Sequence, residues 1–239
     1  MWQIPPTSKT LIKRVQDGRA RLVDLMSGGA TQVSPAPSPP LLPCSPGVPA
    51  NFPPDGNWTA VPGSSPPSPG VYAVSIPGVP PTGCLTWFQA NQACLLSGKR
   101  LVTNREWQGA AAGTPDPGTD ELTMDCAVNS PGPVPTGSRS RCKSTWGVFD
   151  MVGNVDEWVA EWGDRANPFC SDWTSETGTA GGDFGCVGGN GSTSSARIPG
   201  AWFRGGTALT GTFAGVFAVS SVRFRRSPTP PSDSAVPAE

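Results

Sequence analysis

Proline is so dense between residues 35 and 70 that this stretch constrains the fold more than any other feature of the sequence. It reads PAPSPPLLPCSPGVPANFPPDGNWTAVPGSSPPSPG. Proline has no backbone N–H for a helix or sheet ladder, and its ring clashes with a preceding helical turn. The whole chain carries 29 Pro and 30 Gly among 239 residues. We therefore expect residues 35–70 to form a linker or wrapping coil, and the folded part to be rich in loops.

Charge and histidine content exclude several functions. The chain has 17 Lys and Arg against 18 Asp and Glu, and no long basic run, so we expect no nucleic-acid partner. Histidine is absent, which rules out Ser-His-Asp and Cys-His catalysis. We expect no membrane span, because no stretch of 18 apolar residues occurs. The lack of a visible secretion signal favours the cytoplasm, and attachment of residues 1–70 to a surface or particle stays open.

Cysteine spacing suggests disulfides rather than a zinc site, since none of the seven cysteines forms a CxxC pair. Two pairs each bracket a loop rich in Gly, Pro and Ser, and a crosslink would restrict such loops. We predict the disulfides Cys126–Cys142 and Cys170–Cys186. The alternative is that these thiols stay free and pack as small apolar side chains.

Two short helices have clear start signals. Thr86 with Gln89, and Thr103 with Glu106, have the spacing of a capping box, in which each side chain satisfies a backbone N–H at the start of a helix. These pairs predict one helix over about 87–97 and a second from about 104.

Other segments are assigned from their periodicity. Residues 1–34 have mixed helical spacing, which predicts a short amphipathic helical segment for packing or attachment. VYAVSI at 71–76 alternates as a strand does, and the apolar stretches at 147–162 and 203–226 can supply further strands. Residues 114–145 and 163–200 predict long loops.

The stretch WGVFDMVGNVDEWVAEW, at 146–162, reads as scaffold. Gly153 and Asn154 form a turn pair, and we expect the Glu157 carboxylate to accept hydrogen bonds from backbone donors. Large apolar side chains would anchor the neighbouring loops, and the candidates are Trp146, Trp158 and Trp162.

Three ordered motifs then give a resemblance to a known family. GCLTWFQANQACLLSGKRLVTNREWQGAAAG, WGVFDMVGNVDEWVAEW and FRGG resemble, in this order, motifs of formylglycine-generating-enzyme-like domains, a subclass of the C-type lectin fold. The resemblance covers residues 71–226 and implies an α+β fold with two short helices, small antiparallel sheets and long loops. Asp156 stands where relatives usually carry an aromatic residue.

The resemblance bears on metals and catalysis. Relatives can hold calcium through this segment, which makes Asn154, Asp156 and Glu157 the candidate ligands. The copper-dependent enzymes resembled here use cysteines near the last core strand, whereas the last cysteine of this chain is Cys186. The related iron enzymes use histidine, which is absent. We therefore expect a protein that is not an enzyme, has no cofactor other than a possible structural calcium ion, and has no metal centre for catalysis.

The end of the chain, AWFRGGTALTGTFAGVFAVSSVRFRR, is similar to the variable proteins of diversity-generating retroelements. Those proteins keep a fixed frame of the type RGG and AGVFA, and diversify the positions between. The resemblance implies a variable region over about 200–225, followed by a flexible tail at 227–239. Within the frame we expect buried Val216 and Phe217, and an Arg204 that braces the frame through a salt bridge or carbonyl contacts.

The diversified positions would form a binding surface for a protein or another macromolecule. The predicted ligand-contacting residues are Trp202, Phe203, Thr207, Leu209, Thr210 and Phe213. For Leu209 and Phe213 a place in the core stays an alternative. At the level of the whole chain, the alternatives are a formylglycine-generating-enzyme-like enzyme, a catalytically dead relative, and a structural component. Carbohydrate binding is disfavoured, because the sequence lacks the Glu-Pro-Asn and Gln-Pro-Asp triplets of sugar-binding lectins.

Overall fold

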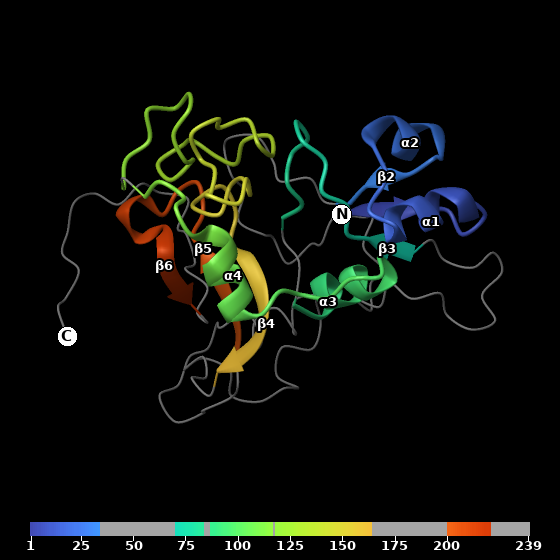
Figure 1. The fold of residues 1–239 in the computed structure, drawn as a ribbon. Coiled ribbons are helices and arrows are strands. Elements are labelled where there is room, and N and C mark those ends of the chain that lie inside the picture. The colour runs from blue at the N-terminus through green and yellow to red at the C-terminus, as the bar shows by residue number, and fades with distance from the viewer. Residues whose placement is uncertain (34–69, 84–86, 117, 164–199, 221–239) are drawn as a thin grey trace, which may run out of the picture.

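The computed structural model describes residues 1–33, 70–83, 87–116, 118–163 and 200–220 (Figure 1). The described residues form two three-stranded antiparallel sheets, ordered β2-β1-β3 and β4-β5-β6, together with short helices. This arrangement confirms the predicted α+β class with small antiparallel sheets. The elements in chain order are β1 (Trp2–Ile4), α1 (Lys9–Gln16), α2 (Leu22–Ser27), β2 (Thr31–Gln32), β3 (Gly70–Tyr72), α3 (Trp87–Leu96), α4 (Asn104–Ala111), β4 (Glu157–Gly163), β5 (Gly200–Gly205), η1 (Gly211–Phe213) and β6 (Gly215–Ser220).

The first 33 residues form strand, helix, helix and strand rather than one helical segment. Gly18 lies between α1 and α2 and has a φ of 68°. Glycine adopts this left-handed conformation without steric cost, so the chain can turn here and end α1. β1 pairs with β3, which places Trp2 opposite Tyr72. The first 33 residues therefore share a core with the segment that follows the proline-rich stretch. This core is formed by Trp2, Ile4, Leu11, Val15, Leu25, Ala30, Tyr72 and Ile76.

Both predicted helices are present in the central part of the chain. α3 ends before Gly98, whose φ of 67° stops the helix. At the start of α4, Thr103 Oγ1 accepts a hydrogen bond from the Glu106 backbone N at 3.2 Å. Glu106 Oε2 accepts in return from the Thr103 backbone N at 2.8 Å. The second capping box is confirmed, whereas the first begins at Thr86, outside the described residues.

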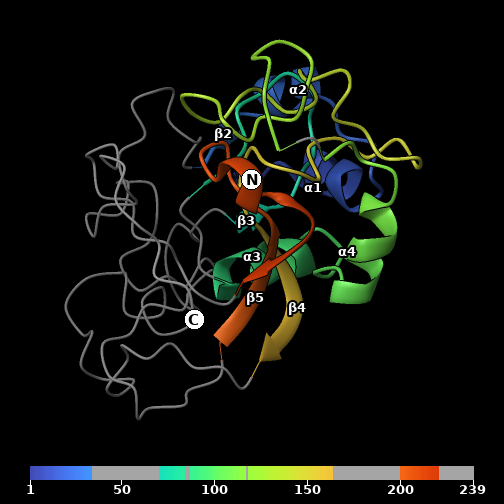
Figure 2. The same ribbon diagram turned by 90° about the vertical axis from the view of Figure 1, so that its left-hand side faces the viewer.

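Helix α4 packs against strands β4 and β6 of the C-terminal sheet (Figures 1 and 2). The side chains between α4 and the sheet include the fully buried Trp107. This cluster is formed by Trp107, Ala111, Met151 and Val159, with the partly buried Ala110, Trp202 and Val216 packed against it.

Residues 112–156 connect α4 to β4. The described part of the predicted loop at 114–145 contains little regular structure, and within the stretch 147–162, which was expected to supply a strand, β4 begins only at Glu157. The disulfide Cys126–Cys142 crosslinks this connection, with 4.6 Å between the two Cα atoms, so this predicted pair is confirmed. The second predicted pair, Cys170–Cys186, lies outside the described residues, as do residues 164–199 of the loop expected at 163–200, whose two end residues belong to β4 and β5. Within the described ranges, no helix has the length and apolar character needed to cross a membrane.

Candidate functional site

Two glycines, Gly205 and Gly206, fix the backbone at the end of β5. Gly205 and Gly206 have φ values of 85° and 82°. A Cβ on Gly206 would lie 2.7 Å from the Cα of Ala214, and one on Gly205 would lie 3.0 Å from the carbonyl oxygen of Met151. Neither position has room for a side chain or a conformation that favours one.

The Gly153-Asn154 turn is hydrogen-bonded directly to this frame. Gly153 N donates to the Gly205 carbonyl at 3.0 Å, and Ala208 N donates to the Asn154 carbonyl at 3.0 Å. A Cβ on Gly153 would lie only 2.2 Å from the carbonyl oxygen of Ala127. The two most recognisable motifs of the sequence therefore form a single structural unit.

Arg204 is buried and braces the frame. Its guanidinium lies over the Trp107 ring, 4.5 Å from the ring centroid. Nη2 donates to the Val216 carbonyl at 3.2 Å and also to the side chain of Gln108. Contacts to a carbonyl group were expected, whereas stacking on an indole was not. Burial lowers the pKa of Arg204 from its ordinary value.

Glu157 lies opposite Arg204 in the pairing of β4 with β5. Its Oε2 accepts a hydrogen bond from Trp107 Nε1 at 2.5 Å, so the partner is a side chain rather than the predicted backbone donors. Burial raises the pKa of Glu157 to about 8, and the nearby carboxylates of Asp150 and Asp156 add to the shift. The carboxyl group therefore holds its proton up to neutral pH.

The predicted contact residues fall into two groups, of which the first is bound up with the core. Phe203 is buried and packs edge-on against Trp158, with 5.4 Å between the ring centroids. Trp202 is partly buried against the cluster around Trp107. These two side chains contribute mainly to packing.

The second group lies in the turn after the frame. Thr207, Leu209 and Thr210 are partly exposed. Thr210 Oγ1 donates to the Thr207 carbonyl at 2.7 Å and accepts from the Thr207 backbone N at 2.6 Å. Phe213 is 72% exposed, so it does not belong to the core. Whether any of the six residues contacts a ligand stays a prediction.

The predictions made from the sequence for two aromatic residues, Phe217 and Trp146, are wrong. Phe217 was expected in the core but is 81% exposed, while its neighbour Val216 is partly buried. Successive residues of a strand point to opposite faces, and this alternation was the signal that could have identified Phe217 as exposed. Trp146, expected to anchor a loop, is 76% exposed. Of the other two tryptophans, Trp158 packs on Phe203, and Trp162 packs edge-on against Trp87.

The candidate calcium ligands do not fit a calcium site. Asn154 Oδ1 accepts from the Val134 backbone N at 2.9 Å, and the carboxyl group of Glu157 faces an indole and holds its proton. Asp156 is exposed. No group of three or more Cys, Asp or Glu side chains that could hold a metal ion occurs among the described residues. Calcium binding gains no support from this geometry.

The fold and the site define a small α+β scaffold in which glycine-locked turns and a buried tryptophan support an irregular loop surface. A family model, the sulfatase-modifying factor enzyme 1-like domain, matches residues 31–212. The chain belongs to this family.

A serine/threonine-protein kinase, pkn1 of Chlamydia caviae, is 32% identical over 85 residues. These residues make up 33% of this chain and 13% of the kinase. The chain therefore spans a small part of the length of this relative.

Proposed function

We propose that the chain is a non-catalytic ligand-binding protein. It carries a hypervariable surface, diversified by a diversity-generating retroelement, on a C-type lectin fold of the formylglycine-generating-enzyme subclass. The family match supports the scaffold. The proposal for the surface rests on the division of residues 202–217 into positions that cannot change and positions that can.

That division is the observation that carries the proposal. The frame positions Arg204, Gly205, Gly206 and Ala214 are all buried, and side chains added at the two glycines would meet backbone atoms. Thr207, Leu209, Thr210 and Phe213 lie between them and reach the surface to different degrees. Substitutions at such surface positions usually change stability by less than about 0.5 kcal/mol. Diversity is therefore tolerated between the frame positions and excluded from them.

The surface chemistry favours a protein or another macromolecular ligand. Exposed aromatic side chains supply apolar contact area with little loss of conformational freedom, and hydroxyl groups supply adaptable hydrogen bonds. Phe213 and Phe217 provide the former, and Thr207 and Thr210 the latter.

The alternative is a formylglycine-generating-enzyme-like activity, and membership of the family favours it. Copper chemistry of that kind needs thiolate ligands, and no cysteine follows Cys186 in the sequence. Among the described cysteines, Cys126 and Cys142 are joined to each other. The proposal therefore excludes catalysis by the C-terminal part of the chain.

Two matched libraries test the proposal. One randomises Thr207, Leu209, Thr210 and Phe213 together, and the other randomises the four buried frame positions. Most members of the first library should resist proteolysis, and selection from that library should yield binders to protein targets. Most members of the second library should be degraded. Equal loss of folded members in the two libraries would contradict the proposal. We further expect the source DNA to contain a reverse-transcriptase gene nearby. Beside it should lie a near-copy of the codons for residues 200–225 that differs from them at adenines.

A further inference from the structure

We infer that the disulfide-closed loop, residues 126–142, is a platform that positions the turn formed by residues 206–211. The crosslink and a buried ion pair would thereby preorganise the candidate binding surface. The functional meaning of this platform rests on the proposed function, but the positioning itself can be tested without a ligand.

Two hydrogen bonds connect the loop to the turn. Gly211 N donates to the Val128 carbonyl at 2.6 Å, and Ser130 N donates to the Ala208 carbonyl at 2.8 Å. Val128 is fully buried, and both loop residues lie within four positions of Cys126. Within the turn, hydrogen bonds join Thr207 to Thr210, and Ala208 N bonds to Asn154. The two bonds from the loop add the contacts that hold the Ala208 carbonyl and the Gly211 amide.

The disulfide fixes one end of that support. Cys126 and Cys142 are completely buried, in a cluster with Val128, Val152 and Ala214. Ala214 immediately follows η1, so the crosslinked sulfur atoms lie in the same packed group as the end of the candidate surface. A crosslink limits the number of conformations that the closed loop can adopt.

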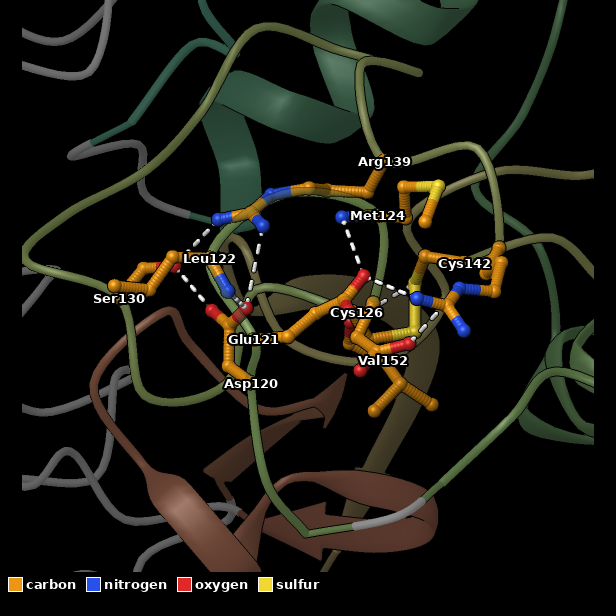
Figure 3. Close-up of polar contacts among 11 residues, drawn as sticks. Asp120, Glu121, Leu122, Met124, Cys126, Ser130, Arg139, Cys142 and Val152 are labelled. Atoms are coloured by element: carbon orange, nitrogen blue, oxygen red, sulfur yellow. Dashed lines mark hydrogen bonds and ion pairs between the residues drawn. A yellow bond between two sulfur atoms is a disulfide. The ribbon is translucent and has the colours of Figure 1, made fainter.

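A buried polar network joins Ser130 and Arg139 of the loop to Asp120, which precedes the loop (Figure 3). Arg139 Nη1 lies 3.2 Å from Asp120 Oδ1, and the two side chains are 5% and 0% exposed. Arg139 Nη2 donates to Ser130 Oγ at 2.9 Å, and Ser130 Oγ donates in turn to Asp120. The Ser130 side chain thus completes the network while its backbone N–H holds the turn.

Such a network favours one arrangement of the loop. A buried ion pair gains little net stability, but separating its partners leaves an uncompensated charge, which penalises other arrangements. The ion pair and the disulfide act on the two ends of the short segment 126–130. Together they define where Val128 and Ser130 present their backbone groups.

Hydrogen exchange of the full chain tests the platform. The double variant C126A/C142A should raise the exchange rate of the Gly211 amide by about tenfold or more, since the loop regains its freedom. The variant S130A leaves both the disulfide and the ion pair in place, and should raise the rate about threefold. Amides of α1 should keep their rates in both variants. The matched control C94A changes a cysteine of α3 that is not in the disulfide and should leave Gly211 unchanged.

Unchanged exchange at Gly211 in S130A and in C126A/C142A would overturn the inference. An equal rise at Gly211 and throughout α1 would overturn it as well, because the crosslink would then support the whole fold rather than the turn. If the double variant does not fold, S130A decides alone. These results are independent of the library experiment, so a rigid platform beneath a surface that binds nothing would refute the proposed function and leave the inference standing.

Discussion

Glu157 and Trp107 are joined by a hydrogen bond of 2.5 Å that ties β4 to α4. The same indole ring carries the Arg204 guanidinium on its face. One buried tryptophan thus connects the GNVDEW segment to the RGG frame. The electrostatics of this connection lead to the first prediction.

Stability should fall as pH rises through the range in which Glu157 prefers to stay protonated. Its pKa is about 8 in the folded chain and 4.5 ordinarily, so the folded state binds the proton more tightly. Its favourable contribution is complete below pH 4.5, declines as pH rises, and is lost above about pH 8. Between pH 5 and 8, the Tm of the wild type should fall on the order of 5 °C further than that of E157Q. Parallel pH profiles from calorimetry of the two proteins would contradict this.

Gly206 should tolerate no side chain. In G206A the new Cβ would lie 2.7 Å from Ala214 at a φ of 82°, and we expect a loss of about 2–3 kcal/mol in the free energy of unfolding. G211A is the matched control, since Gly211 has a φ of 57° but nothing within 4 Å. Its cost should be about 1 kcal/mol. Urea denaturation of both variants measures the difference, and equal losses would show that the space around Gly206 is not limiting.

The two phenylalanines of the candidate surface should differ sharply. F203A removes a buried ring that packs on Trp158 and should cost about 3–5 kcal/mol. F213A removes a ring that is 72% exposed and should change stability by less than about 0.5 kcal/mol. The comparison by urea denaturation separates scaffold from surface, and a large cost for F213A would place it in the scaffold.

The chain should not oxidise a sulfatase-type cysteine. Mixed with copper and a cysteine-bearing peptide, the protein should consume no more oxygen than a control that contains the copper and the peptide without the protein, since no thiol follows Cys186. An oxygen electrode measures the rate, and mass spectrometry of the peptide detects any formylglycine. Oxygen uptake that requires the protein and stops with a chelator would contradict the non-catalytic proposal.

Local chemistry made part of this structure predictable from sequence. The Thr103 and Glu106 box needs only residues three apart, and the Cys126–Cys142 pair brackets one loop, so both could be read along the chain. The strands β1 and β2 could not, because strands of three and two residues leave no period to detect and form only by pairing with distant partners.

The candidate site was harder to predict for the same reason. The RGG and AGVFA motifs identified the frame, but they did not show that Phe203 packs on Trp158 or that Arg204 stacks on Trp107. Both contacts are made between segments far apart in the sequence. The exposure of Phe217 was the one feature that strand alternation alone could have given.

The pairing of Trp2 with Tyr72 sets an order of events during synthesis. β2 can pair with β1 as soon as residue 32 has emerged, but β3, with Tyr72, follows only after the proline-rich stretch. A chain stalled within that stretch would therefore leave the β3 side of Trp2 and Ile4 uncovered and accessible to chaperones and proteases. Nascent chains arrested before and after residue 72 should differ in protease resistance for this reason.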